Sequence, residues 1–163
     1  MANSQILAIY TAIQALSITV NPGAPPVAVT PTVFGLTGIP DSVETAHLPC
    51  RILEIFDNRL QTVQARHSTI SGSVTPNMEV IWSISDLMLW CPEAQGRGVV
   101  DVAYTLVDYC GKYIDMVRAH EAIIASAAIE DCKPIPGVFE YPTESGNFYF
   151  GVWSTLSVKE RVQ

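Results

Sequence analysis

The chain has 163 residues, and its 16 Asp and Glu against 9 Lys and Arg give a formal net charge of −7. This length fits a single domain over residues 1–163, and a hydrophobic content of 48% excludes an intrinsically disordered chain. The scarcity of cations disfavours specific nucleic-acid binding and adsorption to an anionic membrane, because both depend on clustered Lys and Arg. A charged fraction of only 15% is typical of a protein that buries part of its outside against copies of itself.

The four cysteines are predicted to be reduced thiols. Cys50, Cys91, Cys110 and Cys132 form no C-x-x-C pair, and no second pair of zinc ligands accompanies them. No secretory signal is expected, because the first 50 residues contain no Lys or Arg. The apolar run over residues 6–20 is too short to span a bilayer. We therefore expect synthesis and use in a cytosolic compartment.

A helix is predicted at the start of the chain, with Asn3 or Ser4 as its cap. Its apolar residues recur at spacings of three and four from Ile6 onward, and Asn21-Pro22-Gly23 should end it. Residues 22–40 are rich in proline and allow only short extended pieces.

Strands are predicted next. Residues 50–56 alternate, with Cys50 and Ile52 on one face and Arg51 and Leu53 on the other. The polar residues 57–77 fit either a weakly hydrophobic β-hairpin arm or a mobile loop. Residues 78–90 form the longest predicted strand.

The main helix is predicted from residue 98 to about 128, with a kink or break at Gly111. Its apolar stripe consists of Val99, Ala103, Leu106, Cys110, Tyr113, Val117 and Ile124. Residues 131–137 carry two prolines and read as a loop, and residues 138–141 and 147–158 as a closing hairpin. The resulting order of elements predicts an α+β fold, in which a mainly antiparallel sheet is backed by the N-terminal helix and the long central helix.

Candidate nucleophiles are few. No G-x-S-x-G motif is present, and Ser71-Gly72-Ser73 reads as a turn. A Cys–His pair could form from Cys50 and His47 or from Cys110 and His120, but a cysteine on an apolar stripe is more often part of the core. An intracellular Cys or Ser hydrolase therefore stays a minor alternative.

Metal and phosphate sites are not indicated either. His47, His67 and His120 lie far apart, without an HExxH motif or an EF-hand loop. The paired carboxylates Glu130-Asp131 could act in acid–base chemistry but read more simply as an exposed turn at a helix end. Gly96-x-Gly98 lacks the third glycine of a dinucleotide loop. The sequence thus predicts a protein that is not an enzyme, without catalytic, metal-ligating or cofactor-binding residues.

Several loose patterns resemble the tail terminator family of tailed bacteriophages. They are Ile39-Pro40-Asp41-Ser42-Val43, Leu48-Pro49-Cys50, Trp82-Ser83-Ile84-Ser85-Asp86-Leu87-Met88-Leu89 and Gly96-Arg97-Gly98 before a long helix. The ending Gly146-x-x-Tyr149-x-Gly151-Val152-x-x-x-Leu156-x-Val158-x-Glu160 is similar to the last strand and charged tail of such proteins.

The resemblance implies a structural virion protein, assembled in the host cytoplasm as a homohexameric ring. Such a ring caps the growing tail tube, ends its polymerisation and joins the tail to the head connector. The implied partners are the major tail tube protein and the connector or stopper protein, while DNA passes through the lumen without specific binding. Another neck protein (head completion, stopper or adaptor) is the nearest alternative, and a small regulatory binding module is a more distant one.

Charged and polar residues of the predicted arm and of the last strand are the candidate interface. Residues 57–77, and the proline-rich residues 22–40, are interpreted as arms that reach a neighbour or a partner ring. The candidate contact residues are Arg59, Gln61, Gln64, Arg66, His67, Glu79, Lys159 and Arg161.

Overall fold

The computed structural model describes residues 4–20, 28–36, 38–54, 61–68, 77–95, 99–142 and 144–162. The elements are α1 (Ile6–Ala15), β1 (Thr32–Phe34), η1 (Thr45–His47), β2 (Cys50–Glu54), β3 (Gln61–Ser68), β4 (Asn77–Pro92), η2 (Glu93–Gln95), α2 (Val99–Ala119), β5 (Ala122–Ile124), β6 (Ala127–Glu140) and β7 (Phe148–Val162). The seven strands form one sheet in the order β1-β2-β4-β7-β6-β5, and β3 also pairs with β4. All pairings are antiparallel except that of β1 with β2, so the α+β prediction with a mainly antiparallel sheet is confirmed.

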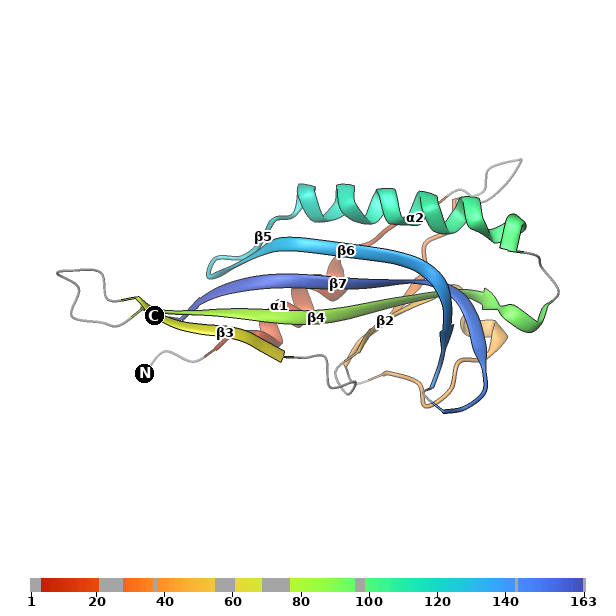
Figure 1. Ribbon diagram of the computed structural model, residues 1–163, viewed down its shortest axis with the longest axis horizontal. Coiled ribbons are helices and arrows are strands. Elements are labelled where there is room, and N and C mark those ends of the chain that lie inside the picture. Colours follow the sequence, from red (N-terminus) through yellow and green to blue (C-terminus); the bar gives the residue numbers. More distant parts are fainter. Residues whose placement is uncertain are drawn as a thin grey trace.

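The long strands β4 and β7 form the centre of an elongated sheet (Figure 1). They pair from Met78↔Val162 to Pro92↔Tyr149, while β2 and β3 follow one another along the other edge of β4. At one end the β3–β4 hairpin extends past β2, and at the other end β6 and β7 bend away from α2. The two ends of the sheet therefore carry different structures.

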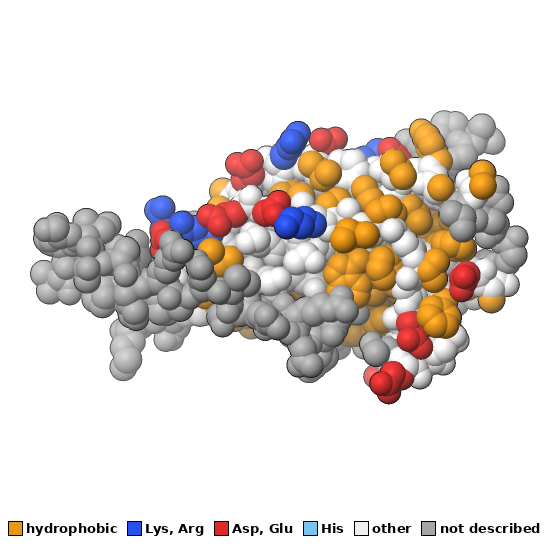
Figure 2. Space-filling model, in the orientation of Figure 1, with side chains coloured by type: hydrophobic (Ala, Val, Ile, Leu, Met, Phe, Trp, Pro, Cys, Tyr) orange, Lys and Arg blue, Asp and Glu red, His pale blue; other side chains and the backbone are white. Residues whose placement is uncertain are grey.

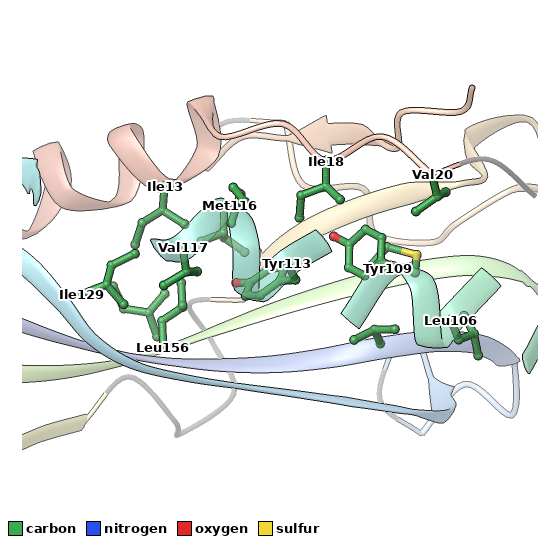
Figure 3. Packing of buried hydrophobic residues seen from close by; sticks show 14 of the residues in the cluster. Ile13, Ile18, Val20, Leu106, Tyr109, Tyr113, Met116, Val117, Ile129 and Leu156 are labelled. Carbon is green, nitrogen blue, oxygen red and sulfur yellow. The ribbon is translucent and has the colours of Figure 1, made fainter. Parts of the chain in front are cut away.

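Both helices pack on one face of the sheet and bury the main core there. Apolar side chains on this face of the central strands, among them Ile84, Met88 and Leu156, pack in one cluster with apolar side chains of α1 and α2. Figure 3 shows Leu156 beside Ile13, Val117 and Ile129. Full burial of each such side chain contributes roughly 1.5–3 kcal/mol. From α1 and α2 the buried hydrophobic residues are Ile9, Tyr10, Ile13, Val102, Leu106, Tyr109, Tyr113, Met116 and Val117. Of the residues predicted to form the apolar stripe of this helix, Leu106, Tyr113 and Val117 are buried in the core. The prediction omitted Val102, Tyr109 and Met116, which are also buried.

A second, smaller core lies on the opposite face at the bent end. Cys50 and Ile52 of β2 point into it, while Leu53 points into the main core, as the alternation predicted. The segment 38–49 covers this core through two tyrosines. Tyr149 Oη donates to the Val43 carbonyl at 2.8 Å, and Tyr141 Oη donates to the Pro40 carbonyl at 3.0 Å.

The long helix is shorter than predicted. It runs unbroken across Gly111 but ends at Ala119 instead of residue 128. The apolar residues that follow belong to β5 and to the start of β6, where Ala127 pairs with Glu160 and Ile129 with Val158. Pairing with β7 makes this segment a strand. A partner so distant in the chain cannot be recognised from the spacing of apolar residues within the segment.

The segment predicted as a proline loop is a strand. Pro134 and Pro136 lie inside β6, opposite Ser154 and Val152 of β7. Among the described residues, β5 covers the outer side of β6 only next to Ala127 and Ala128. The two prolines therefore lie at an open edge, where a missing N–H costs no ladder hydrogen bond.

The other predicted elements are found with shifted bounds. α1 spans Ile6–Ala15, and its N-cap is Gln5 without a side-chain cap hydrogen bond, so the prediction of a cap at Asn3 or Ser4 is wrong. The Ser4 hydroxyl still accepts the Ile6 amide hydrogen at 3.3 Å. Within the predicted arm, residues 61–68 form β3 and favour the hairpin alternative over the loop. Residues 57–60 and 69–76, the Ser71-Gly72-Ser73 turn and Gly96-x-Gly98 lie outside the described residues.

A buried ion pair joins the sheet to both helices. Arg51 on β2 donates to Asp86 on β4, with Nε–Oδ2 at 2.8 Å and Nη2–Oδ2 at 2.6 Å, and each residue is only 1% exposed. The same guanidinium donates to the carbonyls of Ile13 and Leu16 at the end of α1. Tyr113 of α2 donates its hydroxyl to Asp86 at 2.8 Å.

Replacing one member of this ion pair should destabilise the fold strongly. Arg51→Met leaves the Asp86 carboxylate buried without its counter-charge, so we expect the free energy of unfolding to fall by about 3–5 kcal/mol. The double variant Arg51→Met/Asp86→Leu should recover much of this loss, because it removes both charges. Urea unfolding measures both, and a loss below about 1 kcal/mol for the single variant would contradict the assignment.

Two glycines provide a matched test of backbone contacts. A Cβ at Gly151 on β7 would collide with the Met88 carbonyl oxygen of β4, whereas a Cβ at Gly111 of α2 meets nothing within 4 Å. Gly151→Ala should therefore lower the free energy of unfolding by about 2–3 kcal/mol. Gly111→Ala should raise it by about 0.5–1 kcal/mol through helix propensity. Thermal unfolding of both variants checks the opposite signs, and equal signs would show that the β4–β7 register is wrong.

Candidate functional site

A cluster of charged side chains lies where β4, β6 and β7 run side by side. Glu79 of β4 contacts two cations of β7, with its carboxylate 3.1 Å from Lys159 Nζ and 3.6 Å from Arg161 Nε. Lys159 Nζ also lies 3.8 Å from the carboxylate of Glu130 on β6. We call Glu79, Glu130, Lys159 and Arg161 the charged cluster.

Strand register places the predicted arm beside this cluster. Arg66 of β3 pairs with Glu79, which pairs on its other side with Arg161. Gln64 pairs with Ile81, which in turn pairs with Lys159. The remaining candidates on β3, Gln61 and His67, pair with Ser83 and Met78. Arg59 lies outside the described residues.

These ion pairs contribute little to stability, because the side chains are exposed. The exposed fractions are 30% for Glu79 and Lys159, 44% for Glu130 and 71% for Arg161. Exposed pairs of this kind contribute about 0–1 kcal/mol. Beside them, a hollow of about 390 Å³ is lined by the β5–β6 turn, including Ala122 and Ser126, together with Lys159 and Arg161. The arrangement therefore suits recognition of a polar partner surface better than stabilisation of the fold.

A second surface lies at the opposite, bent end of the molecule and is apolar (Figure 2). We call this surface the α2–β6 patch. It consists of large hydrophobic side chains that are exposed on α2, β6 and β7: Val100 (86% exposed), Tyr104 (72%), Val107 (63%), Ile135 (58%), Val138 (42%) and Phe148 (44%). A groove of about 240 Å³ runs between α2 and β6 within it, and no charged residue lines this groove.

The sequence analysis missed the α2–β6 patch, although a signal was present. Val100, Tyr104 and Val107 recur at spacings of four and three, so they form a second apolar stripe on the side of the helix opposite the one that packs on the sheet. On β6, Ile135 falls in the segment 131–137 that was interpreted as a loop, whereas Val138 belongs to the predicted hairpin strand.

The two Cys–His pairs do not form activated nucleophiles. Burial raises the pKa of the Cys50 thiol to about 12, so the thiol is neutral at physiological pH. His47 accepts the Glu44 amide hydrogen through Nδ1 at 3.2 Å. Burial also raises the pKa of Cys110, which lies about 15 Å along the helix axis from His120.

Glu130 and Asp131 are found in strand β6, not in a turn at a helix end, because α2 has already ended at Ala119. Each carboxylate is more than two-fifths exposed and lies near a lysine, Glu130 near Lys159 and Asp131 near Lys133. In the part of the chain that the structure describes, no three His, Cys, Asp or Glu residues gather as a metal site would require. No helix among the described residues is long and apolar enough to cross a membrane.

The fold and its surfaces define an α+β protein with a charged cluster at one end of its sheet and an apolar patch at the other. No protein-family model matches the chain, and no curated protein or solved structure is significantly similar to it. Interpretation of its function therefore depends on the described surfaces and on the sequence patterns.

Thiol labelling tests the nucleophile assignment. With a pKa of about 12, the Cys50 thiolate fraction at pH 7.5 is about a thousandfold below that of an ordinary thiol. We expect a disulfide reagent to label Cys50 in the folded protein only after local unfolding, and rapidly in urea. Mass spectrometry of each peptide, with free glutathione as the reference, measures the rate. Labelling of native Cys50 faster than glutathione would instead indicate a catalytic thiol.

Proposed function

We propose that the protein is a structural component of a phage tail, a tail terminator that closes the head-proximal end of the tail tube. Its subunits form a ring, of six by the resemblance in its sequence patterns, and the ring ends polymerisation of the tube by covering its last layer. The same ring then offers its other face to the head connector.

Two unlike surfaces at opposite ends of an elongated sheet carry this proposal (Figures 1 and 2). A subunit whose two ends differ associates head to tail, and such contacts generate a closed ring when the rotation between subunits closes. The α2–β6 patch supplies an apolar contact, and the charged cluster supplies a polar one.

The β3–β4 hairpin suits contact with a partner ring. It extends past β2 along the edge of β4, and among the described residues β3 pairs only with β4. An edge strand of this kind can accept a further strand from another chain, because its outer N–H and C=O groups are available for pairing. We therefore assign the contact with the tail tube protein to this hairpin.

The net charge of −7 also suits passage of DNA. Affinity for DNA depends on cations that neutralise phosphates. The two cations of the charged cluster, Lys159 and Arg161, both lie beside the Glu79 carboxylate, which offsets their charge. A ring lined by such subunits would let the duplex slide without gripping it.

Electron microscopy of the purified protein and of tail tubes tests the proposal. We expect negatively stained rings of about six subunits in a concentration series, and one ring at the end of each added tube. Tubes assembled in the presence of the protein should be shorter than tubes assembled with an equal amount of bovine serum albumin.

Two results would reject the terminator assignment. Binding to purified head connectors without binding to tube ends would instead identify another neck protein, such as a stopper or adaptor. If the protein is monomeric at all concentrations and the tube ends stay bare, the proposal that it forms a ring is rejected.

A further inference from the structure

The exposed large hydrophobic side chains are concentrated at one place. Seven are exposed among the described residues, and all except Leu7 belong to the α2–β6 patch. Scattered single hydrophobic residues are ordinary on a protein surface, whereas exposed ones gathered at one end around an apolar groove mark a contact surface. Val107 and Val138 line this groove, and Ile135, which pairs with Trp153, lies on the other face of β6. This concentration requires an occupant of apolar chemistry at its centre.

The rim of the patch indicates the charge of that occupant. Among the described residues, the exposed or half-exposed carboxylates of the bent end are Asp41, Glu44, Glu93, Glu140 and Glu144, against one exposed cation two residues from the patch member Ile135, namely Lys133. The sequence contains no Lys or Arg over residues 134–158, which include the β6–β7 turn. Lys133, just before this stretch, lies 3.6 Å from Asp131. The occupant should therefore present cations around an apolar centre.

The same chain offers cations at its other end. Arg161 is 71% exposed, with its Nε 3.6 Å from the Glu79 carboxylate, and is the more available of the two cations. Lys159, shared between Glu79 and Glu130, lines the hollow beside the β5–β6 turn. A second copy placed head to tail would bring these cations to the acidic rim. A symmetric contact of patch against patch would instead bring two acidic rims together, and like charges at a contact oppose association.

Strand addition does not explain the contact at β6. Pro134 and Pro136 lie at the open edge of this strand and provide no N–H to an added strand. Side chains of the patch must therefore make the contact, with the α2–β6 groove receiving apolar groups of the neighbour.

We propose that the α2–β6 patch binds a second copy of this chain head to tail, through the surface around Lys159 and Arg161 of that copy. The inference rests on the proposed ring and names the surfaces by which its subunits meet. Each copy then buries its patch and offers its charged cluster to the next one.

Three single variants test the two halves of the contact. Val107→Glu places a charge in the patch, and Arg161→Glu reverses a charge at the other end. Leu7→Glu is the matched control, because Leu7 is equally exposed (66%) on a helix but lies outside the patch. Far-UV circular dichroism verifies folding of each variant, and sedimentation velocity measures assembly over a concentration series.

We expect rings for the wild type and for Leu7→Glu, and monomers for Val107→Glu and Arg161→Glu alone. An equimolar mixture of the two monomeric variants should yield a one-to-one dimer, because each retains the surface that the other has lost. Only a contact between unlike surfaces produces this complementation.

The remaining outcomes overturn the proposed docking surface, the proposed terminator ring, or both. Rings formed by Val107→Glu, or two monomeric variants that fail to complement, would overturn the docking surface while leaving the ring intact. Head-to-tail assembly that never binds tail tubes would support the docking surface and reject the terminator function. A wild type that is monomeric both in solution and with tail tubes would overturn both.

Discussion

The guanidinium of Arg51 joins the sheet to the helix layer, because it contacts a neighbouring strand and the end of α1 at once. It is buried in β2, paired with Asp86 of β4, and donates to carbonyls at the end of α1. A buried ion pair is retained only when its remaining donors and acceptors are satisfied. The carbonyls of Ile13 and Leu16 satisfy the guanidinium, and the Tyr113 hydroxyl of α2 completes the coordination of the carboxylate. The positions of both helices on the sheet therefore follow from this pair.

The other end of α1 is fixed by a charge of the opposite sign. Glu160 of β7 is 1% exposed and accepts the Gln5 amide, the Ser4 hydroxyl and the Trp82 indole N–H. A carboxylate at the first turn and a guanidinium at the last both match the helix dipole. Because side chains alternate along a strand, the neighbours of this buried carboxylate, Lys159 and Arg161, point to the opposite face. One stretch of β7 thus anchors α1 on one side and builds the charged cluster on the other.

Local patterns were sufficient for the fold class but not for contacts across the sheet. The alternation of Cys50 and Ile52 against Leu53 predicted the two faces of β2 correctly. In contrast, Pro134 and Pro136 indicate a loop unless it is known that their strand lies at an open edge. Arg51 and Asp86 are 35 residues apart, so nothing in the sequence marks them as partners. The charged candidates on β3, β4 and β7 could be named, but only the strand register places them side by side.

The long helix links the core to the proposed assembly. One stripe of α2 packs on the sheet through Leu106 and Tyr113, while a second stripe leaves Tyr104 and Val107 exposed. A helix that is apolar on two sides is satisfied only when both sides are buried. Further along the same helix, the residues that continue this stripe at spacings of four, four and three are Gly111, Asp115 and Arg118, all exposed, so the second stripe is confined to the first half of α2. In the proposed assembly the bent end of one copy meets the charged cluster of the next, and the outer edge of β3, which among the described residues pairs with β4 alone, stays available to a different partner.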